Sequence, residues 1–286
     1  MMMSMHPRIR TFAFKSFLAV CSIAFLAYVL FPYYWMLATA LKPKIELFVS
    51  PPTWIPSELV WENLIIPWRL FPIARYFANS IFVTGSTVVL AVIIGAMAGY
   101  GLKKAGARLG ALIISLLLFT QLLPGIVTTV PFFFWMRRLG LLNTYIGLIL
   151  PYLAWTLPFA ILMLRAYFVD AYPTDLEEAA TIDGCSRIQT FIRVVLPLSV
   201  PGLIAAGSFS FMLAWKEFLW ASIMLSSGRK RPIAIGLRDL IGEGGSVQYI
   251  SEFMAVSIAT TIPAFVVFFF VQKYITGGIT AGAVKS

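Results

Sequence analysis

Long apolar runs separated by short polar segments dominate the sequence. A helix that crosses a bilayer needs about 20 mostly apolar residues, and six stretches reach this length. The six predicted spans cover residues 17–37, 77–102, 109–133, 142–168, 201–225 and 253–274. The pattern therefore predicts an all-α membrane protein in which residues 1–286 form a single transmembrane domain.

Small residues and prolines inside the spans predict a packed and kinked bundle. Gly95 and Gly99 form a GxxxG step in the second span, which lets another helix approach its backbone closely. Proline removes a backbone donor, so a helix that contains one bends and depends on its neighbours. The third and fourth spans contain Pro124, Pro131, Pro151 and Pro158.

The composition agrees with a lipid environment. Hydrophobic residues make up 60% of the chain and charged residues 12%, and the mean hydropathy is +0.88. A soluble domain carries about 25% charged residues, so too little polar material is present to cover a water-facing surface. The formal net charge is +10, but the basic residues stand in short groups between apolar runs, so we expect no nucleic-acid partner.

The first span and the basic residues predict the orientation. This span is longer than the apolar core of a signal peptide, about 7–15 residues, and it ends in aromatic residues typical of a membrane interface. We expect it to remain as a helix. The two sides of the membrane carry nearly equal numbers of Lys and Arg. The basic N-terminal tail and the tight turn at residues 103–108 favour cytoplasmic N- and C-termini.

The residue types needed for catalysis or metal binding are missing. Two cysteines and one histidine, His6, do not make a Cys/His metal site. Gly277 and Gly282 have the spacing of a phosphate-binding loop, but Ala283 stands where that loop requires lysine. We therefore expect no metal, no cofactor and no enzymatic activity in this chain.

The polar segment between the fourth and fifth predicted spans contains two helix-start signatures. Thr174 with Glu177, and Ser186 with Gln189, match the capping box, in which the two side chains satisfy each other's free amides. Gly184 lies between them, where a left-handed residue would end the first helix. The segment is thus predicted to form two short helices joined by a glycine bend, outside the bilayer.

The charges of this hairpin, residues 172–197, suggest what it contacts. An amphipathic helix lying on lipid is one possibility, and the apolar positions of the second half suit it. The first half, however, is acidic, and an anionic leaflet repels acidic side chains. A basic protein partner therefore fits better. The acidic residues are Asp175, Glu177, Glu178 and Asp183.

The spacing of the hairpin resembles the EAA loop of binding-protein-dependent ABC importers. Glu178-Ala179-Ala180, Gly184 and Leu196-Pro197 have the family's spacing, and Val194 stands where the family usually has Ile. The resemblance extends over nearly the whole chain, to permease subunits of the carbohydrate-uptake class, maltose-permease G-subunit type. The other matching runs are residues 40–43, 79–80, 141–145 and 278–285.

The resemblance implies a function and a set of partners. It implies a permease subunit of an ATP-driven oligosaccharide importer in the bacterial cytoplasmic membrane, surrounded by lipid. Its partners would be a second related permease, two ATPase subunits that hold ATP and Mg, and an extracytoplasmic solute-binding protein. The hairpin would be the cytoplasmic coupling helix that contacts the ATPase. The residues assigned to this role are Glu177, Glu178, Ala179, Ala180, Asp183, Gly184, Arg187 and Pro197.

Lys216 and Glu217 are charged residues near the centre of the fifth predicted span. A charge at mid-bilayer costs about 2.5–3.5 kcal/mol on insertion scales, so neither is expected to face lipid. Either each pairs with a group on another helix or subunit, or Lys216 lines the substrate pathway. The resembled family generally has Asn at the position of Lys216. Lysine offers a positive charge to a carboxylate or phosphate.

Our hypothesis for the substrate is therefore an acidic saccharide, such as an alginate-like uronate oligosaccharide. Neutral sugars and glycerol phosphodiesters are the alternatives. Trp215 and Trp155 are further pathway candidates because indole rings stack on sugars, although aromatic residues in a span more often serve packing or the membrane interface. Asn79 and Gln121 are candidate polar lining residues. An ion-coupled secondary transporter is the alternative from another class, but it gives the hairpin no purpose.

Overall fold

The computed structural model describes residues 7–170, 175–226, 228–242 and 247–283, so His6, Thr174 and Lys285 lie outside the described residues. The described residues contain helices and no strand, which confirms the predicted all-α class. Four helices are long and apolar enough to cross a membrane, and the number rises to six if each of two bent helix pairs is one span.

The described residues form two compact units, although the sequence predicts a single domain. One unit lies within residues 1–71 and 239–260, and the other within residues 72–238 and 261–286. The helix α13, Ile250–Ala283, contributes its first part to one unit and its later part to the other. Each unit is described by itself below.

The first unit consists of a long helix and a structured loop. The helix α1, Pro7–Leu41, contains the predicted span 17–37. The short helices η1 (Lys44–Glu46), η2 (Trp61–Leu64) and α2 (Ile66–Leu70) follow it. The buried Asn63 donates to the carbonyls of Ala40 and Lys42, both at 3.0 Å, and so fixes the chain where it leaves α1.

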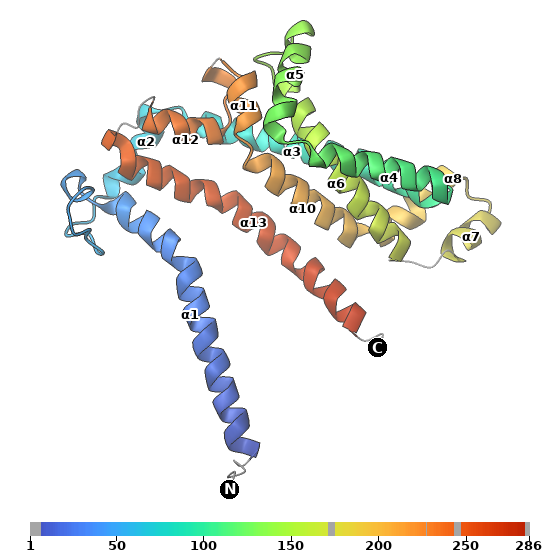
Figure 1. The fold of residues 1–286 in the computed structure, drawn as a ribbon, viewed down its shortest axis with the longest axis horizontal. Coiled ribbons are helices and arrows are strands. Elements are labelled where there is room, and N and C mark those ends of the chain that lie inside the picture. Colours follow the sequence, from blue (N-terminus) through green and yellow to red (C-terminus); the bar gives the residue numbers. More distant parts are fainter. Residues whose placement is uncertain (1–6, 171–174, 227, 243–246, 284–286) are drawn as a thin grey trace. The chain divides into compact units, whose positions relative to one another are not determined.

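Three helices of the second unit pack side by side. They are α3 (Ile73–Lys104), α6 (Ile146–Asp170) and α10 (Val200–Trp215) (Figure 1). The predicted GxxxG step lies in the α3–α6 contact. A Cβ placed on Gly99 would lie 2.9 Å from the backbone nitrogen of Arg165, and one on Gly95 would lie 3.1 Å from Ala160 Cβ. Only glycine permits this approach of the two backbones.

The predicted span 109–133 is not one straight helix. It is divided between α4 (Ala107–Leu122) and α5 (Gly125–Arg138), which meet at 97°. Pro124 has no backbone N–H and disfavours a helical conformation at the residue before it, and Leu123 is accordingly extended. By contrast, Pro151 and Pro158 lie inside the continuous helix α6.

The predicted span 201–225 is also interrupted. The helix α10 ends at Trp215, and the short helix α11, Leu219–Met224, begins after Lys216 and Glu217. At its other end, α10 follows the hairpin directly. The segments Arg187–Leu198 and Val200–Trp215 meet at a bend of 78°. These two interruptions show that an apolar run can predict a membrane-embedded segment without predicting that the segment is one continuous helix.

The two ends of the α3–α6–α10 layer differ in what packs there. Figure 1 shows the hairpin helices α7 (Asp175–Ile182) and α8 (Arg187–Thr190) at one end and α11 at the other. At the hairpin end, the fully buried Phe168 and Val195 form the core with Ala96, Leu164 and Ala206. At the other end, Trp220, Ala221 and Met224 of α11 pack into a second core. The helix α12, Ile233–Ile241, follows that second end in the chain.

Candidate functional site

The first arm of the hairpin ends in a glycine-specific turn. Gly184 has a φ of +82°, a conformation that side chains with a Cβ disfavour. The Gly184 amide donates to the Thr181 carbonyl at 3.1 Å, and the Cys185 amide donates to the Ala180 carbonyl at 2.9 Å. This pair of bonds is a Schellman motif, which ends α7 and reverses the chain.

The second arm begins at a reciprocal cap. The Ser186 hydroxyl accepts from the Gln189 amide at 3.4 Å, and the Ser186 amide donates to Gln189 Oε1 at 2.8 Å. The capping box expected here from the sequence is therefore present. The arm continues through a π-helical turn, Phe191–Val195, and α9, Leu196–Leu198. Thr174, the other predicted cap, lies outside the described residues.

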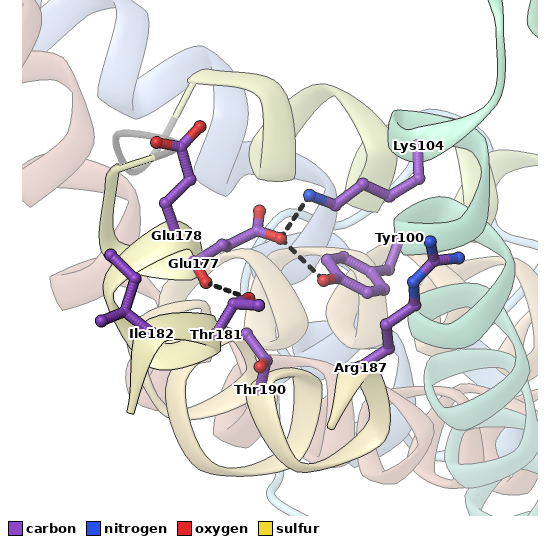
Figure 2. A pocket seen from close by; sticks show the side chains of 8 residues that line it. All are labelled: Tyr100, Lys104, Glu177, Glu178, Thr181, Ile182, Arg187 and Thr190. Carbon is purple, nitrogen blue, oxygen red and sulfur yellow. Dashed lines mark hydrogen bonds and ion pairs between the residues drawn. The ribbon is translucent and has the colours of Figure 1, made fainter. Parts of the chain in front are cut away.

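Glu177 is turned inward onto the end of α3. It is 4% exposed, and its two carboxylate oxygens receive three bonds. Figure 2 shows the bonds from Lys104 and Tyr100. Lys103 Nζ lies 2.9 Å from Oε1, Lys104 Nζ lies 2.6 Å from Oε2, and Tyr100 OH donates to Oε2 at 2.7 Å. Burial alone would raise the pKa of this carboxyl, but the bonds from Lys104, Lys103 and Tyr100 outweigh it and lower the pKa to about 2.

Glu178, the next residue, is exposed. Figure 2 shows its carboxylate turned away from Lys104 and Tyr100. It lines an open pocket of about 600 Å³ together with Ile182 and Arg187. Tyr100, Lys104 and Glu177 line the same pocket. Of the other residues assigned to the hairpin's role, Ala180 is buried, and the remaining ones are exposed: Ala179, Asp183, Gly184 and Pro197.

An aromatic contact holds the second arm against the same end of α3. The Tyr100 ring stacks on Phe191, with 4.9 Å between the ring centroids, and meets Phe168 of α6 edge-on at 6.2 Å. The sequence analysis did not assign Tyr100, Lys103 or Lys104 to the hairpin. They occupy positions i, i+3 and i+4, so they share one helix face. A basic face on one helix and an acidic hairpin elsewhere in the chain were the available signal that the two could pair.

Glu217 has a structural partner at the other end of the layer. Its carboxylate accepts from the backbone amides of Trp220 at 2.8 Å and Ala221 at 3.2 Å. These are amides at the start of α11, which lack partners within a helix. An acidic group there also interacts favourably with the helix dipole. Glu217 therefore caps α11 within its own chain.

Lys216 is exposed, and no hydrogen bond or ion pair involves its side chain within the described ranges. The neighbouring Trp215 ring stacks on Phe211 at 5.5 Å and lies 6.4 Å from the Phe77 ring. Since Phe77 is in the first turns of α3, the pair Lys216–Glu217 lies near the end of the layer opposite the hairpin. The expectation that both charges lie near the centre of a continuous span was wrong, because the helix ends at Trp215.

Both polar atoms of the Asn79 side-chain amide are hydrogen-bonded within the protein. Its Nδ2 donates to the carbonyls of Arg229 at 3.0 Å and Arg231 at 2.9 Å, and its Oδ1 accepts from Tyr145 OH at 2.8 Å. It therefore fixes the loop before α12 against α3. Asn79 is 5% exposed, which leaves little of it for a solute.

The remaining pathway candidates lie near the bend between α4 and α5. Gln121 is half-buried in the last turn of α4, and its Oε1 has no hydrogen-bond donor in the described part of the chain. Trp155 of α6 is half-buried, with its ring edge next to Gly125 at the start of α5. The described residues contain no group of three or more His, Cys, Asp or Glu side chains able to hold a metal ion.

Apolar helices of spanning length, with a polar two-helix projection at one end, define a multi-spanning membrane protein. The sequence profile of the family described as "binding-protein-dependent transport system inner membrane component" matches residues 91–281, and the chain belongs to this family.

Known relatives match the chain over most of its length. The inner membrane ABC transporter permease protein YcjP of Escherichia coli (strain K12) is 35% identical, covering 93% of this chain and 95% of that protein. The sulfoquinovosyl glycerol transport system permease protein SmoH of Agrobacterium fabrum is 37% identical, covering 90% and 89%. The trehalose/maltose transport system permease protein MalG of Thermococcus litoralis is 34% identical, covering 90% and 91%.

A solved structure shares the fold. It is the crystal structure of a bacterial ABC transporter involved in the import of the acidic polysaccharide alginate. One of its chains matches this protein with a TM-score of 0.78, 22% sequence identity, and coverage of 94% of this chain and 98% of that chain. At this identity the match supports the fold of the subunit.

Proposed function

We propose that the chain is the permease subunit of an ATP-driven, binding-protein-dependent carbohydrate importer. In this proposal it forms half of the translocation pathway with a second related permease. Two ATPase subunits bind ATP and Mg, and an extracytoplasmic solute-binding protein delivers the solute. Family membership and relatives named as sugar-transport permeases, such as MalG and SmoH, support this function.

The hairpin is the proposed contact with the ATPase. The observation that carries this proposal is the different exposure of two adjacent acids: Glu177 is buried and bonded to α3, whereas Glu178 is exposed at the rim of an open pocket. An exposed acid beside an open pocket suits a basic side chain of a partner protein. In this arrangement the hairpin and both termini are cytoplasmic, and α11 lies toward the extracytoplasmic side.

Site-specific crosslinking tests this contact. The native Cys21 and Cys185 are first replaced by serine, and a single cysteine is placed at Ile182, which is 86% exposed and lines the pocket. In membranes that contain the whole transporter, we expect this cysteine to crosslink to the ATPase. The matched control is a cysteine at Ile45, which is 83% exposed in the loop after α1. Crosslinking at Ile45 but not at Ile182 would contradict the proposal.

The proposed solute is an acidic saccharide. Lys216 is exposed beside Trp215, whose ring suits sugar stacking. No acidic side chain in the described part of the chain pairs with its ammonium group. A charge-assisted hydrogen bond contributes about 1.5–3 kcal/mol. We therefore expect Lys216→Asn to lower the preference for a uronate trisaccharide over a neutral trisaccharide by about tenfold in transport assays. An unchanged preference for the uronate would remove the proposed role of Lys216, and a wild type that prefers the neutral trisaccharide would favour the neutral-sugar alternative.

Energy coupling separates the importer from the ion-coupled alternative. In proteoliposomes that contain the whole complex, uptake is expected to require ATP and the solute-binding protein. It should persist when ionophores remove proton and sodium gradients. Uptake driven by an ion gradient without ATP would instead support a secondary transporter.

A further inference from the structure

We infer that Glu177, Lys103, Lys104 and Tyr100 form an internal strut that transmits hairpin movement to α3. This inference rests on the proposed function, in which an ATPase moves the hairpin. It assigns Glu177 a role inside this chain, as a positioning residue, in place of the ATPase contact expected from the sequence. Lys103, Lys104 and Tyr100 join it as positioning residues.

Both oxygens of the Glu177 carboxylate are already bonded within the chain. Oε1 is bonded by Lys103, and Oε2 is bonded by both Lys104 and Tyr100. The side chains of Glu177 and Lys103 are only 6% and 9% exposed. A partner protein would have to break these bonds to reach Glu177, whereas Glu178 is available without any rearrangement. Glu177 therefore contacts its own subunit, and Glu178 remains available to a partner protein.

Both arms of the hairpin are attached to the same turn of α3. Glu177 attaches the first arm through Lys103 and Lys104, and Phe191 attaches the second arm by stacking on Tyr100. A single contact would act as a pivot and allow the hairpin to rotate. Attachment of both arms to one helix face fixes the orientation of the hairpin as well as its position.

The attachment lies next to a close backbone contact between α3 and α6. Gly99 precedes Tyr100, and its backbone lies against Arg165 of α6. Force applied at the end of α3 therefore moves α3 and α6 together. Residues 77 and 103 of α3 are about 39 Å apart at 1.5 Å per residue. The strut thus connects the hairpin with the distant end where Phe77 meets Trp215.

The test measures solute moved per ATP hydrolysed in proteoliposomes that contain the complete transporter. Glu177→Gln removes the charge and keeps the shape of the side chain. We expect the transporter to assemble and hydrolyse ATP while the solute-to-ATP ratio falls at least fivefold, the lower range of typical coupling effects. Asp170→Asn is the matched control, because it removes an exposed acid at the end of α6, outside the residues assigned to the hairpin, and it should leave the ratio unchanged.

A distance measurement distinguishes a strut from a merely structural residue. Spin labels are placed at Ile182 of the hairpin and Met97 of α3, which are 86% and 61% exposed. In the otherwise wild-type protein, we expect the same distance with and without ATP, because the hairpin and α3 move together. In the Glu177→Gln variant, ATP should change or broaden that distance.

The milder variants Lys104→Gln and Tyr100→Phe keep the test decisive if Glu177→Gln does not assemble. Each removes one of the three bonds, and each should lower the solute-to-ATP ratio. Normal ratios in both, or in Glu177→Gln, would overturn the strut. If the wild-type hairpin itself fails to crosslink to an ATPase, the proposed function fails. If that crosslink forms while the variants remain fully coupled, only the strut fails.

Discussion

Glu177 and Glu178 are adjacent in α7, yet Glu177 is 4% exposed and contacts α3 while Glu178 faces an open pocket. Successive residues of an α-helix point about 100° apart. Two adjacent acids on a short helix can therefore contact different neighbours. The inner acid secures the helix to its own subunit. The outer acid is left for a partner.

Charge reversal at Glu178 should weaken ATPase binding without unfolding the hairpin. Glu178→Lys places a positive charge where we expect a basic partner, and like charges across an interface suppress association. We expect the affinity for the purified ATPase to fall by about tenfold or more. Asp170→Lys is the control, because Asp170 is an exposed acid at the end of α6, outside the hairpin. Equal affinity of wild type and Glu178→Lys would exclude a basic partner at this position.

The attachment of Glu177 should be insensitive to pH over the physiological range. Its folded pKa, about 2, lies below the usual carboxyl value of 4.5. The ionised form therefore stabilises the fold above about pH 4.5, and this stabilisation disappears as the pH falls from 4.5 toward 2. Hydrogen exchange of residues 175–182, corrected for intrinsic rates, should show equal protection at pH 7 and pH 5.5. Lower protection at pH 5.5 would contradict the depressed pKa.

Adding a single methyl group at Gly99 should destabilise the protein. A Cβ there would lie 2.9 Å from Arg165 N, against backbone that has no room to move. Overpacking of this kind costs about 1–3 kcal/mol. Gly101→Ala is the matched control, because nothing lies within 4 Å of its added Cβ, and alanine favours a helix by about 1 kcal/mol. Thermal unfolding in detergent should show Gly99→Ala destabilised and Gly101→Ala unchanged or stabilised.

Local signals in the sequence predict local structure well here. The Ser186–Gln189 cap and the Gly184 bend are present because each depends on residues close in the chain. The ion pair between Lys103 and Glu177 joins residues separated by 74 positions. The spacing of Tyr100, Lys103 and Lys104 marks one face of α3, but nothing in the sequence specifies which acid lies against that face. The pairing itself is therefore seen only in the fold.

Interruptions of the apolar runs were harder to locate for a related reason. Pro124 marks a kink, but the sequence alone does not distinguish its 97° bend from the continuous helix around Pro151 and Pro158. The difference lies in the tertiary packing that each proline meets. Likewise, the charges of Lys216 and Glu217 are explained by a helix end that hydropathy does not detect.

Asn79 should prove a structural residue in stability measurements. Asn79→Ala leaves the carbonyls of Arg229 and Arg231 and the Tyr145 hydroxyl without this partner. An unsatisfied buried group costs about 1–3 kcal/mol, so we expect a clear loss of thermal stability. Asn79→Asp retains an acceptor for Tyr145 but places oxygen against the two carbonyls, and it should be destabilised too. A change in solute preference at unchanged stability would instead make Asn79 a pathway residue.

Glu217 should act through the helix that follows it. Glu217→Ala removes the acceptor for the amides of Trp220 and Ala221, and loss of a helix cap costs about 0.5–2 kcal/mol. Glu217→Gln keeps one acceptor oxygen and should lose less. Trp220 is 6% exposed and packs against Phe132 at 5.0 Å, so its fluorescence reports whether α11 stays in place. We expect quencher access to increase in the order wild type, Glu217→Gln, Glu217→Ala. Equal access in all three would show that α11 holds its position without this carboxylate.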